Sequence, residues 1–140
     1  MKFMILVKAT PESEAGRFPP DSEKMFEAMA EYHEQLAQAG VLLDASGLQP
    51  SSKGWRIRYD GERRTVVDGP FIESKELIAG YTMIQVRNRD EALEWSRRFP
   101  NPVGTARRAE IEVRQVYEME DFTGLVEPAT ADRFKQMGMD

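Results

Sequence analysis

The chain has 140 residues, of which 41% are hydrophobic and 31% charged, a length and composition that predict one mixed globular domain with its own core. Its 19 basic and 24 acidic side chains give a net charge of −5 at pH 7, which argues against nucleic-acid binding because such proteins usually carry a basic face. There is no cysteine, so disulfides, thiol nucleophiles and thiolate metal ligands are excluded, and a reducing, cytoplasmic location is expected.

The first third of the chain predicts a strand, a helix and a second strand. Residues 3–7 are continuously apolar, as in a buried strand, and the run is too short for a signal sequence or a membrane span, so no membrane contact is expected. After a loop rich in proline and glycine, Asp21 or Ser22 is expected to cap a helix that stops at Gly40. The apolar stripe of this helix consists of Met25, Met29, Tyr32 and Leu36. A strand over 41–46 follows.

The middle of the chain predicts a hairpin between two loops. The first loop is the turn-rich segment 47–52. Apolar and basic residues alternate over 55–59, a return strand covers 63–67, and Asp60-Gly61 between them favours a tight turn. The return strand runs into Asp68-Gly69-Pro70-Phe71, where a turn explains the first three residues but not the aromatic ring.

The last third predicts strand, helix and strand again. One face of a strand over 81–86 is formed by Thr82, Ile84 and Val86. Asn88 is expected to cap a helix, with Glu91 at the third position as in a capping box. The inner stripe of this helix consists of Ala92, Trp95, Ser96 and Phe99. A strand over 111–117 and a short helical stretch near 130–137 complete the chain.

Strand–helix–strand thus occurs twice, at 3–46 and 81–117, with a β-hairpin inserted between the two units. Two such units predict an α+β fold with a ferredoxin-like split βαβ sheet and both helices on one face, because crossover connections are right-handed. We expect residues 1–120 to form a single domain, and 121–140 to form a tail whose short helix packs on a partner. The helix-free face of the sheet would expose apolar side chains, so pairing of two sheets in a homodimer is predicted.

Three segments of the sequence resemble the YCII-related family of bacterial proteins, and specifically its DGPF branch. They are GLQPSS at 47–52, DGPF at 68–71, and GYTMIQV followed by DEALEW between residues 80 and 95. The opening MKFMILVK and the closing IEVRQVYEM are similar to the same family, so the resemblance extends to about residue 120. It implies a dimeric α+β barrel. It also implies small-molecule chemistry with a His–Asp pair in some members, and association of DGPF proteins with extracytoplasmic-function sigma factors.

Asp68 and His33 are the candidate catalytic residues. The Asp68 carboxylate precedes the stiff Gly69-Pro70 turn and lies near Phe71, and partial desolvation beside an aromatic wall would suit a general base. The alternative is that Asp68 accepts backbone hydrogen bonds within the turn while Phe71 plugs the end of the barrel. His33 is the only histidine and lies at the edge of its helix's apolar stripe, where we expect it to be solvated, although an edge histidine can also reach a cleft. The resemblance places it near the position of the family's histidine, not at it.

Further residues are candidates for binding a ligand. Gln49 and Ser51 offer an amide and a hydroxyl in the first loop, and Phe71 and Tyr81 would supply walls of a mixed polar and apolar pocket. Arg56 could pair with an anionic substrate or with a partner subunit. For each of these residues a structural or solvated role is the alternative.

Metal and cofactor sites are not expected. His33-Glu34 begins an HExxH pattern, but Ala37 stands where the second histidine would be needed, so the zinc motif is incomplete. The glycine-rich motifs of phosphate and dinucleotide sites are absent from the sequence.

Two functional hypotheses follow from these residues. In the first, the protein binds a small molecule in a dimer cleft near the Asp68–Phe71 loop and acts as a cofactor-independent acid/base enzyme, for proton abstraction or elimination on a cyclic or carbonyl compound. In the second, it is a non-catalytic dimeric accessory or regulatory module, associated with a sigma factor as the family resemblance implies. The residues alone do not decide between them.

Overall fold

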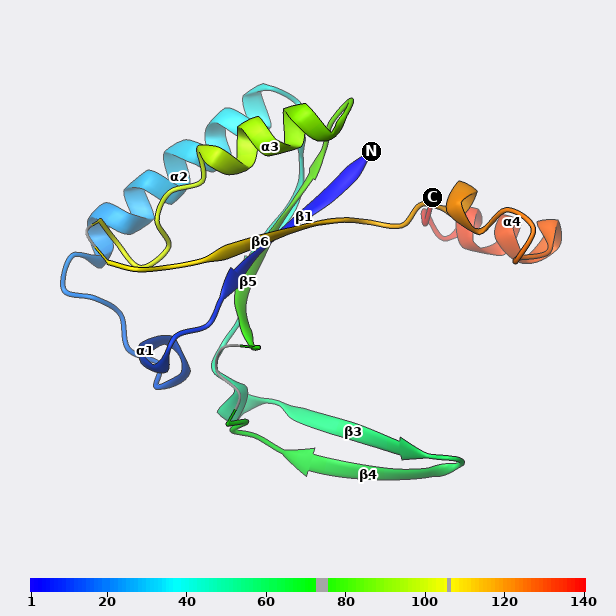
Figure 1. Cartoon of the computed structure of the whole chain (residues 1–140), viewed down its shortest axis with the longest axis horizontal. Coiled ribbons are helices and arrows are strands. Elements are labelled where there is room, and N and C mark those ends of the chain that lie inside the picture. Colours follow the sequence, from blue (N-terminus) through cyan, green and yellow to red (C-terminus); the bar gives the residue numbers. More distant parts are fainter. Residues whose placement is uncertain (73–75, 106) are drawn as a thin grey trace.

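Four strands form the main sheet of the structure, a computed structural model that describes residues 1–72, 76–105 and 107–140 (Figure 1). Their bounds are β1 Lys2–Lys8, β2 Leu42–Gly47, β5 Ile78–Gln85 and β6 Ile111–Gln115. The strand order is β2-β5-β1-β6, and every neighbouring pair is antiparallel. The predicted α+β class is confirmed, and this strand order is consistent with a ferredoxin-like arrangement.

Two helices lie on the same side of this sheet, α2 (Ser22–Gln38) and α3 (Arg89–Arg97) (Figure 1). Asn88 caps α3 as predicted, because its Oδ1 accepts the backbone N–H of Glu91 at 2.9 Å. The predicted capping box is not formed, since Glu91 Oε2 accepts the backbone N–H of Arg87 instead. Asp21 occupies the N-cap position of α2 but makes no side-chain cap bond there, since its carboxylate pairs with Arg107 instead. A short helix, α1 (Pro11–Glu14), forms in the segment that was expected to be a loop.

The core lies between the sheet and these two helices. Alternating residues of β1 and β5 point toward the helices, as the period-2 pattern of a strand requires. The buried apolar cluster comprises Phe3, Ile5, Tyr32, Leu36, Val41, Ile84, Val86 and Ala92. The predicted inner face of Thr82, Ile84 and Val86 is confirmed as buried. The predicted stripe of α2 is buried only in its second half, because Met25 and Met29 are half-buried and line a cavity.

Strands β3 (Trp55–Asp60) and β4 (Arg63–Asp68) form a separate two-stranded antiparallel sheet. The hairpin extends away from the main sheet at the bottom of Figure 1. A 3₁₀ turn, η1 (Ser51–Lys53), joins it to the loop after β2. Several of its apolar side chains are exposed, since no other described element covers them.

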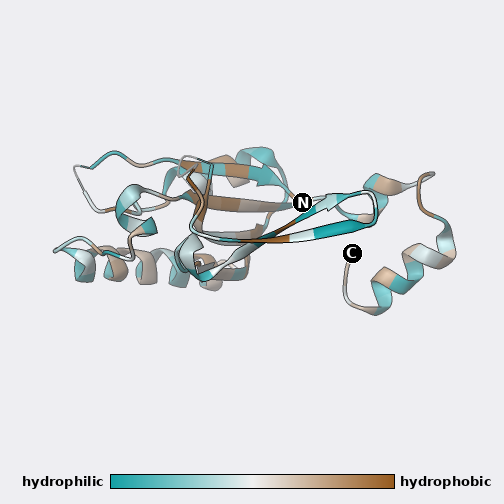
Figure 2. Ribbon diagram, turned by 90° about the horizontal axis from the view of Figure 1, so that it is seen from below, coloured by the Kyte–Doolittle hydropathy of each residue, from teal (hydrophilic) through white to brown (hydrophobic). Residues whose placement is uncertain are grey.

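The C-terminal segment contains a 3₁₀ turn, η2 (Met119–Phe122), and α4 (Pro128–Gln136), near the predicted 130–137 helix. It lies to one side of the sheet, away from α2 and α3 (Figure 1). The ribbon seen from below and coloured by hydropathy shows strongly hydrophobic segments in the strands of the main sheet (Figure 2). None of the helices that the structure describes is long and apolar enough to cross a membrane.

Candidate functional site

A cavity of about 1040 Å³ lies between the sheet and the first half of α2. Its other walls are the segment around α1, the loop that follows it, the ends of β2 and β5, and the segment after α3. Most of its lining is apolar, including Val7, Phe18, Met25, Phe26, Met29, Phe99 and Val103. Pockets of this size and character are those in which proteins bind small organic molecules.

His33 is the polar group that α2 contributes to this cavity. Its Nδ1 lies 2.7 Å from the carbonyl oxygen of Met29, and its Nε2 lies 2.8 Å from the hydroxyl of Thr82. A carbonyl oxygen can only accept, so Nδ1 carries the proton, and in the neutral ring Nε2 accepts the Thr82 hydroxyl. The expectation of a solvated His33 is therefore wrong, and the alternative, that an edge histidine reaches a cleft, is correct.

The fold fixes the orientation of this imidazole from three sides. Met29 lies one helical turn before His33 on α2, and Thr82 is buried on the helix-facing side of β5. The ring of Phe99 lies edge-on, with its centroid 6.2 Å from that of His33. The neighbouring Tyr32 is buried, and its hydroxyl donates to the carbonyl oxygen of Trp95 at 2.7 Å, which joins α2 to α3.

Gln49 and Tyr81, two of the predicted ligand-binding residues, are among the residues that line the cavity. The Tyr81 side chain belongs to the opposite face of β5 from Thr82, because adjacent residues of a strand alternate. Its hydroxyl donates to Asp44 Oδ2 at 2.8 Å, and this hydrogen bond raises the pKa of the Tyr81 phenol.

Ser51 and Phe71 belong to a hydrogen-bonded cluster at the base of the hairpin. The backbone N–H of Phe71 donates to Ser51 Oγ at 3.0 Å, and the Ser51 hydroxyl donates in turn to the carboxylate of Glu14. The backbone N–H of Ser51 donates to the other oxygen of the same carboxylate at 3.1 Å. One serine thus connects the loop after β4 to the short helix α1.

This cluster explains part of the Asp68-Gly69-Pro70-Phe71 motif. Gly69 N–H donates to the carbonyl oxygen of Gly54 at 3.0 Å, and a Cβ on Gly69 would lie 1.9 Å from the carbonyl oxygen of Ser51. Only glycine permits so close an approach of two backbones. The ring of Phe71 is covered by the Arg56 guanidinium, whose carbon lies 3.8 Å from the ring centroid.

Asp68 lies outside the cavity. It is exposed at the end of β4, directly opposite Trp55, and is not among the residues that line the cavity around His33. The structure therefore brings together His33 and Gln49 at the cavity, and Ser51, Phe71 and Arg56 at the hairpin base, whereas the Tyr81 side chain is directed to the helix-free face of the sheet. The catalytic role assigned to Asp68 stays a prediction.

Sequence reasoning missed two partners in these clusters. Thr82 was recognised only as an inward-facing core residue, and its contact with His33 spans 49 positions. Glu14 lies 37 positions from Ser51, in a segment that was expected to be a loop. Neither pair leaves a local signal, although an inward-facing threonine in an otherwise apolar strand does indicate that a buried hydroxyl needs a partner.

The rim of the cavity carries charged groups. Arg107 Nη1 lies 3.1 Å from Asp21 Oδ1 and 2.8 Å from the carbonyl oxygen of Val103, which ties the segment after α3 to the start of α2. Arg17 and Arg108 also line the cavity. Among residues 1–72, 76–105 and 107–140, no cluster of three or more His, Asp or Glu side chains is arranged to hold a metal ion.

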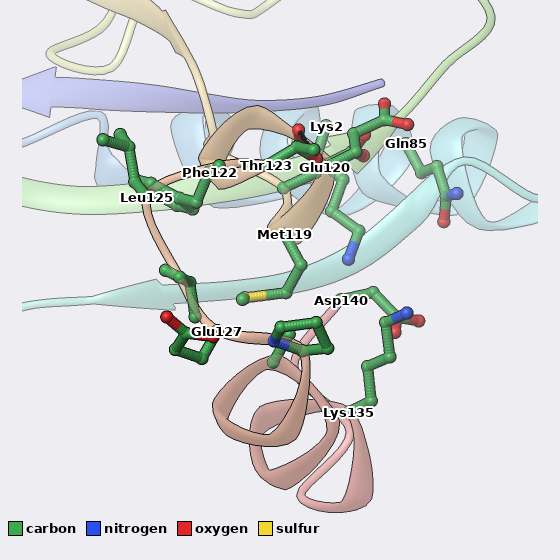
Figure 3. A pocket seen from close by; sticks show the side chains of 15 residues that line it. Lys2, Gln85, Met119, Glu120, Phe122, Thr123, Leu125, Glu127, Lys135 and Asp140 are labelled. Carbon is green, nitrogen blue, oxygen red and sulfur yellow. Dashed lines mark hydrogen bonds between the residues drawn. The ribbon is translucent and has the colours of Figure 1, made fainter.

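A second cavity, of about 820 Å³, lies between the end of the main sheet and the C-terminal segment. Figure 3 shows Lys2 and Gln85 on the sheet side and Lys135 and Asp140 on the side of α4. This cavity contains no histidine, and much of its lining is charged. The cavity at His33 is the better candidate site, because there a titratable ring meets an apolar wall.

These features define a small α+β protein with a cavity on the helical side of its sheet. The YCII-related domain matches residues 1–120, so the chain belongs to that family, as its sequence motifs predicted. An uncharacterized protein of Rhizobium meliloti (strain 1021) is 28% identical over 81 residues, which are 58% of this chain and 65% of that protein. The match thus spans less than two thirds of the length of this curated relative.

Among solved structures, the chain is similar to a 5-chloro-2-hydroxyhydroquinone dehydrochlorinase from Burkholderia phenoliruptrix AC1100, in complex with 2,5-dihydroxybenzoquinone. The TM-score is 0.41 and the sequence identity 14%, over 84% of this chain and 95% of that one. At this TM-score and identity the similarity carries no argument about the chemistry of this chain.

Proposed function

We propose that the cavity beside α2 binds a small, largely apolar molecule that carries a hydrogen-bonding group, and that His33 exchanges a proton with this group. The observation that carries the proposal is the position of His33, a half-buried imidazole with both nitrogens in hydrogen bonds at the wall of an apolar cavity. The proposed site is thus on the helical side of one chain's sheet, rather than in a dimer cleft near Asp68.

The chemistry available to this pair is proton transfer without a cofactor. The Nδ1–H bond to the Met29 carbonyl fixes one tautomer and leaves Nε2 as the basic nitrogen. The Thr82 hydroxyl, which Nε2 accepts, can rotate toward a bound ligand and free Nε2 to take a proton from it. Proton abstraction next to a carbonyl, or elimination from a ring, needs no more than such a positioned base.

Pairing of two copies through the helix-free faces of their sheets is part of the proposal, as is membership of the DGPF branch. The centre of that face carries Met4, Leu6, Tyr81 and Met83, all half-buried in the single chain. Covering these side chains would remove apolar surface from water, which favours association.

A second candidate is the non-catalytic accessory module, with or without a sigma factor as partner. One observation favours it: the His33 nitrogens bond to a carbonyl and a hydroxyl and to no carboxylate, so the His–Asp pair implied by the family resemblance is not assembled. In this alternative the cavity takes no small molecule, and the same experiment separates the two candidates.

The experiment is methyl NMR of protein labelled at methionine, titrated with benzoate, phenol and toluene as probes. Met25 and Met29 line the cavity, whereas Met137 and Met139 are exposed on the C-terminal segment and act as internal controls. We expect benzoate or phenol to shift the methyl signals of Met25 and Met29, and toluene, which has no hydrogen-bonding group, to bind more weakly.

A matched pair of variants tests the role of the hydroxyl. Thr82→Val keeps the shape of the side chain and removes the group that Nε2 contacts, so we expect benzoate or phenol to bind several-fold more weakly or more tightly. Thr82→Ser keeps the hydroxyl and should behave as the parent. Because His33 is the only histidine, its ring ¹⁵N signals report the tautomer directly, with Nδ1 protonated. Probe shifts confined to Met137 and Met139 would sink the proposal and favour the accessory module.

A further inference from the structure

The β3–β4 hairpin carries an exposed apolar face. The register pairs Ile57 with Val66 and Tyr59 with Arg64, so these side chains lie on the same face as Trp55. The four apolar residues among them are 45–66% exposed, an unusual amount for a Trp, an Ile, a Tyr and a Val so close together. The Arg64 guanidinium lies 5.0 Å from the Tyr59 ring centroid, so this apolar face carries a positive charge near the hairpin turn, while Asp68, opposite Trp55, adds a carboxylate at the hairpin base.

The C-terminal segment, residues 118–140, is also apolar and exposed, but of opposite charge. Leu125, Met137 and Met139 are 83%, 66% and 54% exposed. The segment has six acidic and two basic side chains, a net −4, which is most of the −5 of the whole chain. The hairpin, residues 55–68, has four arginines against three acids, and of these arginines Arg64 lies on the apolar face. Both segments are therefore apolar and exposed, and the tip of the apolar face carries a positive charge where the C-terminal segment is acidic.

Within one chain the two segments leave the main sheet at opposite ends. Lys2 of β1 pairs with Gln85 and Lys8 with Ile78, so β1 and β5 define two ends of the sheet. The hairpin connects to β2 and β5 at the end marked by Lys8. The C-terminal segment follows β6, whose last residue pairs with Phe3 near the other end. In Figure 1 the hairpin leaves the bottom of the sheet and the C-terminal segment follows β6 at mid-height, and both extend to the right.

A two-fold axis that lies between the two facing sheets and runs perpendicular to their strands reverses these ends. The strands of a second copy then run antiparallel to those of the first, and the hairpin end of each sheet lies over the C-terminal end of the other. Every contact in a two-fold interface occurs twice. The hairpin and the C-terminal segment of both copies are therefore covered, and none of these four apolar segments stays exposed to solvent.

We infer that the apolar face of the hairpin packs on residues 118–140 of a second copy of this chain, reciprocally, with Arg64 on that face directed toward the acidic side chains of the segment. The inference rests on the two-fold pairing of sheets proposed above. It adds a contact between the hairpin of each copy and the C-terminal segment of the other. Hairpin and C-terminal segment together hold 37 residues, more than the roughly 20–30 residues that each side of a standard interface contributes.

The test uses two full-length charge-reversal variants and sedimentation velocity at low salt. The hairpin variant carries Arg64→Glu on the apolar face, and the C-terminal variant carries Glu120→Lys and Asp132→Lys. Each variant alone then has like charges at both contacts, and we expect its dimer dissociation constant to rise about tenfold or more. An equimolar mixture has opposite charges at both contacts, so it should form a heterodimer with affinity close to the parent's.

A control variant, Glu27→Lys with Glu31→Lys, makes the same change of charge as the C-terminal variant, but on the exposed side of α2. It should leave the dimer dissociation constant unchanged. Trp55 gives a second readout in a Trp95→Phe background, because its emission should shift to the blue as dilute protein is concentrated. If the mixture has a dissociation constant no lower than that of either variant alone, or if Trp55 emission does not depend on concentration, the contact between hairpin and C-terminal segment is overturned. The proposed pairing of the sheets is not affected by that result. A parent chain that stays monomeric overturns both. Neither result touches binding at His33, which the methyl signals test separately.

Discussion

His33 shows how one side chain is placed by two elements. Its own helix supplies the acceptor for Nδ1, and β5 supplies the hydroxyl for Nε2, so the ring cannot turn without breaking two hydrogen bonds. The net contribution of one such hydrogen bond to the stability of the fold is about 1 kcal/mol, and leaving a buried polar group without a partner costs more than that. The imidazole is therefore held ready at the cavity wall before any ligand arrives.

Tyr32, the residue before His33, is the clearest case of a side chain whose protonation is coupled to folding. It is 3% exposed, and burial raises the pKa of its phenol to about 12, an effect that the nearby positive charge of Arg98 partly opposes. The folded pKa lies above the ordinary value of 10.0, so the buried neutral phenol stabilises the fold fully below pH 10. This contribution is lost as the pH rises from 10 toward 12.

We predict that Tyr32→Phe costs about 1 kcal/mol at neutral pH, through the lost hydrogen bond to the Trp95 carbonyl. Between pH 10 and 12 the parent should lose stability faster than the variant, because the variant has no phenol to ionise at this site. Urea unfolding of both proteins at pH 7, 10 and 11.5 measures the difference, and curves that stay parallel across this range would contradict it.

Among the elements, the loop after β4 is held in position by contacts of its backbone more than by the ring of Phe71. Ser51 accepts from Phe71 N–H and donates to Glu14, while Gly69 approaches the Ser51 backbone too closely for any Cβ. The hairpin is thereby fixed to the loop after β2 and to α1, next to the cavity. In this way the base of the hairpin shapes one wall of the candidate site.

Two glycines beside the Ser51 carbonyl oxygen give a matched test. A Cβ on Gly69 would lie 1.9 Å from that oxygen, whereas a Cβ on Gly54 would lie 3.7 Å from it, an ordinary contact. We predict that Gly69→Ala destabilises the protein by about 2 kcal/mol, as overpacking typically does. Gly54→Ala should be neutral or slightly stabilising, because it restricts the unfolded chain. Thermal unfolding compares them, and equal losses of stability would refute the close approach.

On the scale of the whole molecule, the sheet has one face covered by helices and one without. On the helix-free face, Met83 pairs with Met4 and with Asp44, so an apolar centre is bordered by charge. Glu112 continues this border on β6, where hydrogen bonds and ion pairs to Lys8 and Arg114 lower its pKa. An apolar centre with a charged rim is the usual anatomy of an interface between subunits.

Met83→Lys tests this face. In the proposed dimer a lysine in the centre of the paired sheets would have to be desolvated twice, once in each copy, so we expect this variant to be a monomer that still unfolds cooperatively. Ala30→Lys adds the same charge on the exposed side of α2 and should leave the dimer intact. Light scattering after size-exclusion chromatography distinguishes them. A dimeric Met83→Lys variant would show that the copies pair elsewhere.

Patterns with a short period predicted much of this fold. The apolar run at 3–7, the alternation at Thr82, Ile84 and Val86, and the cap at Asn88 all depend on neighbours within a few positions, and each is confirmed. The short helix at Pro11–Glu14 was missed because proline and glycine around it resemble a loop, although Thr10 and Ser13 form a capping box there. The observed boundaries of β2 and β5 differ from the predicted ones by one to three residues. A strand ends where its hydrogen bonds to the neighbouring strand end, and residue types alone do not give that position.

The family, the α+β class and the inward faces of the strands could be predicted from the residues alone, because local periodicity and motifs read in order define them. Which polar groups come into contact follows instead from the packing of the fold. His33 contacts Thr82 across 49 positions and Ser51 contacts Glu14 across 37, and such pairs depend on how helix and sheet pack, which no local pattern encodes. For the same reason the acid that looked most reactive in the sequence, Asp68, lies on the surface, while the lone histidine expected in solvent lines the cavity.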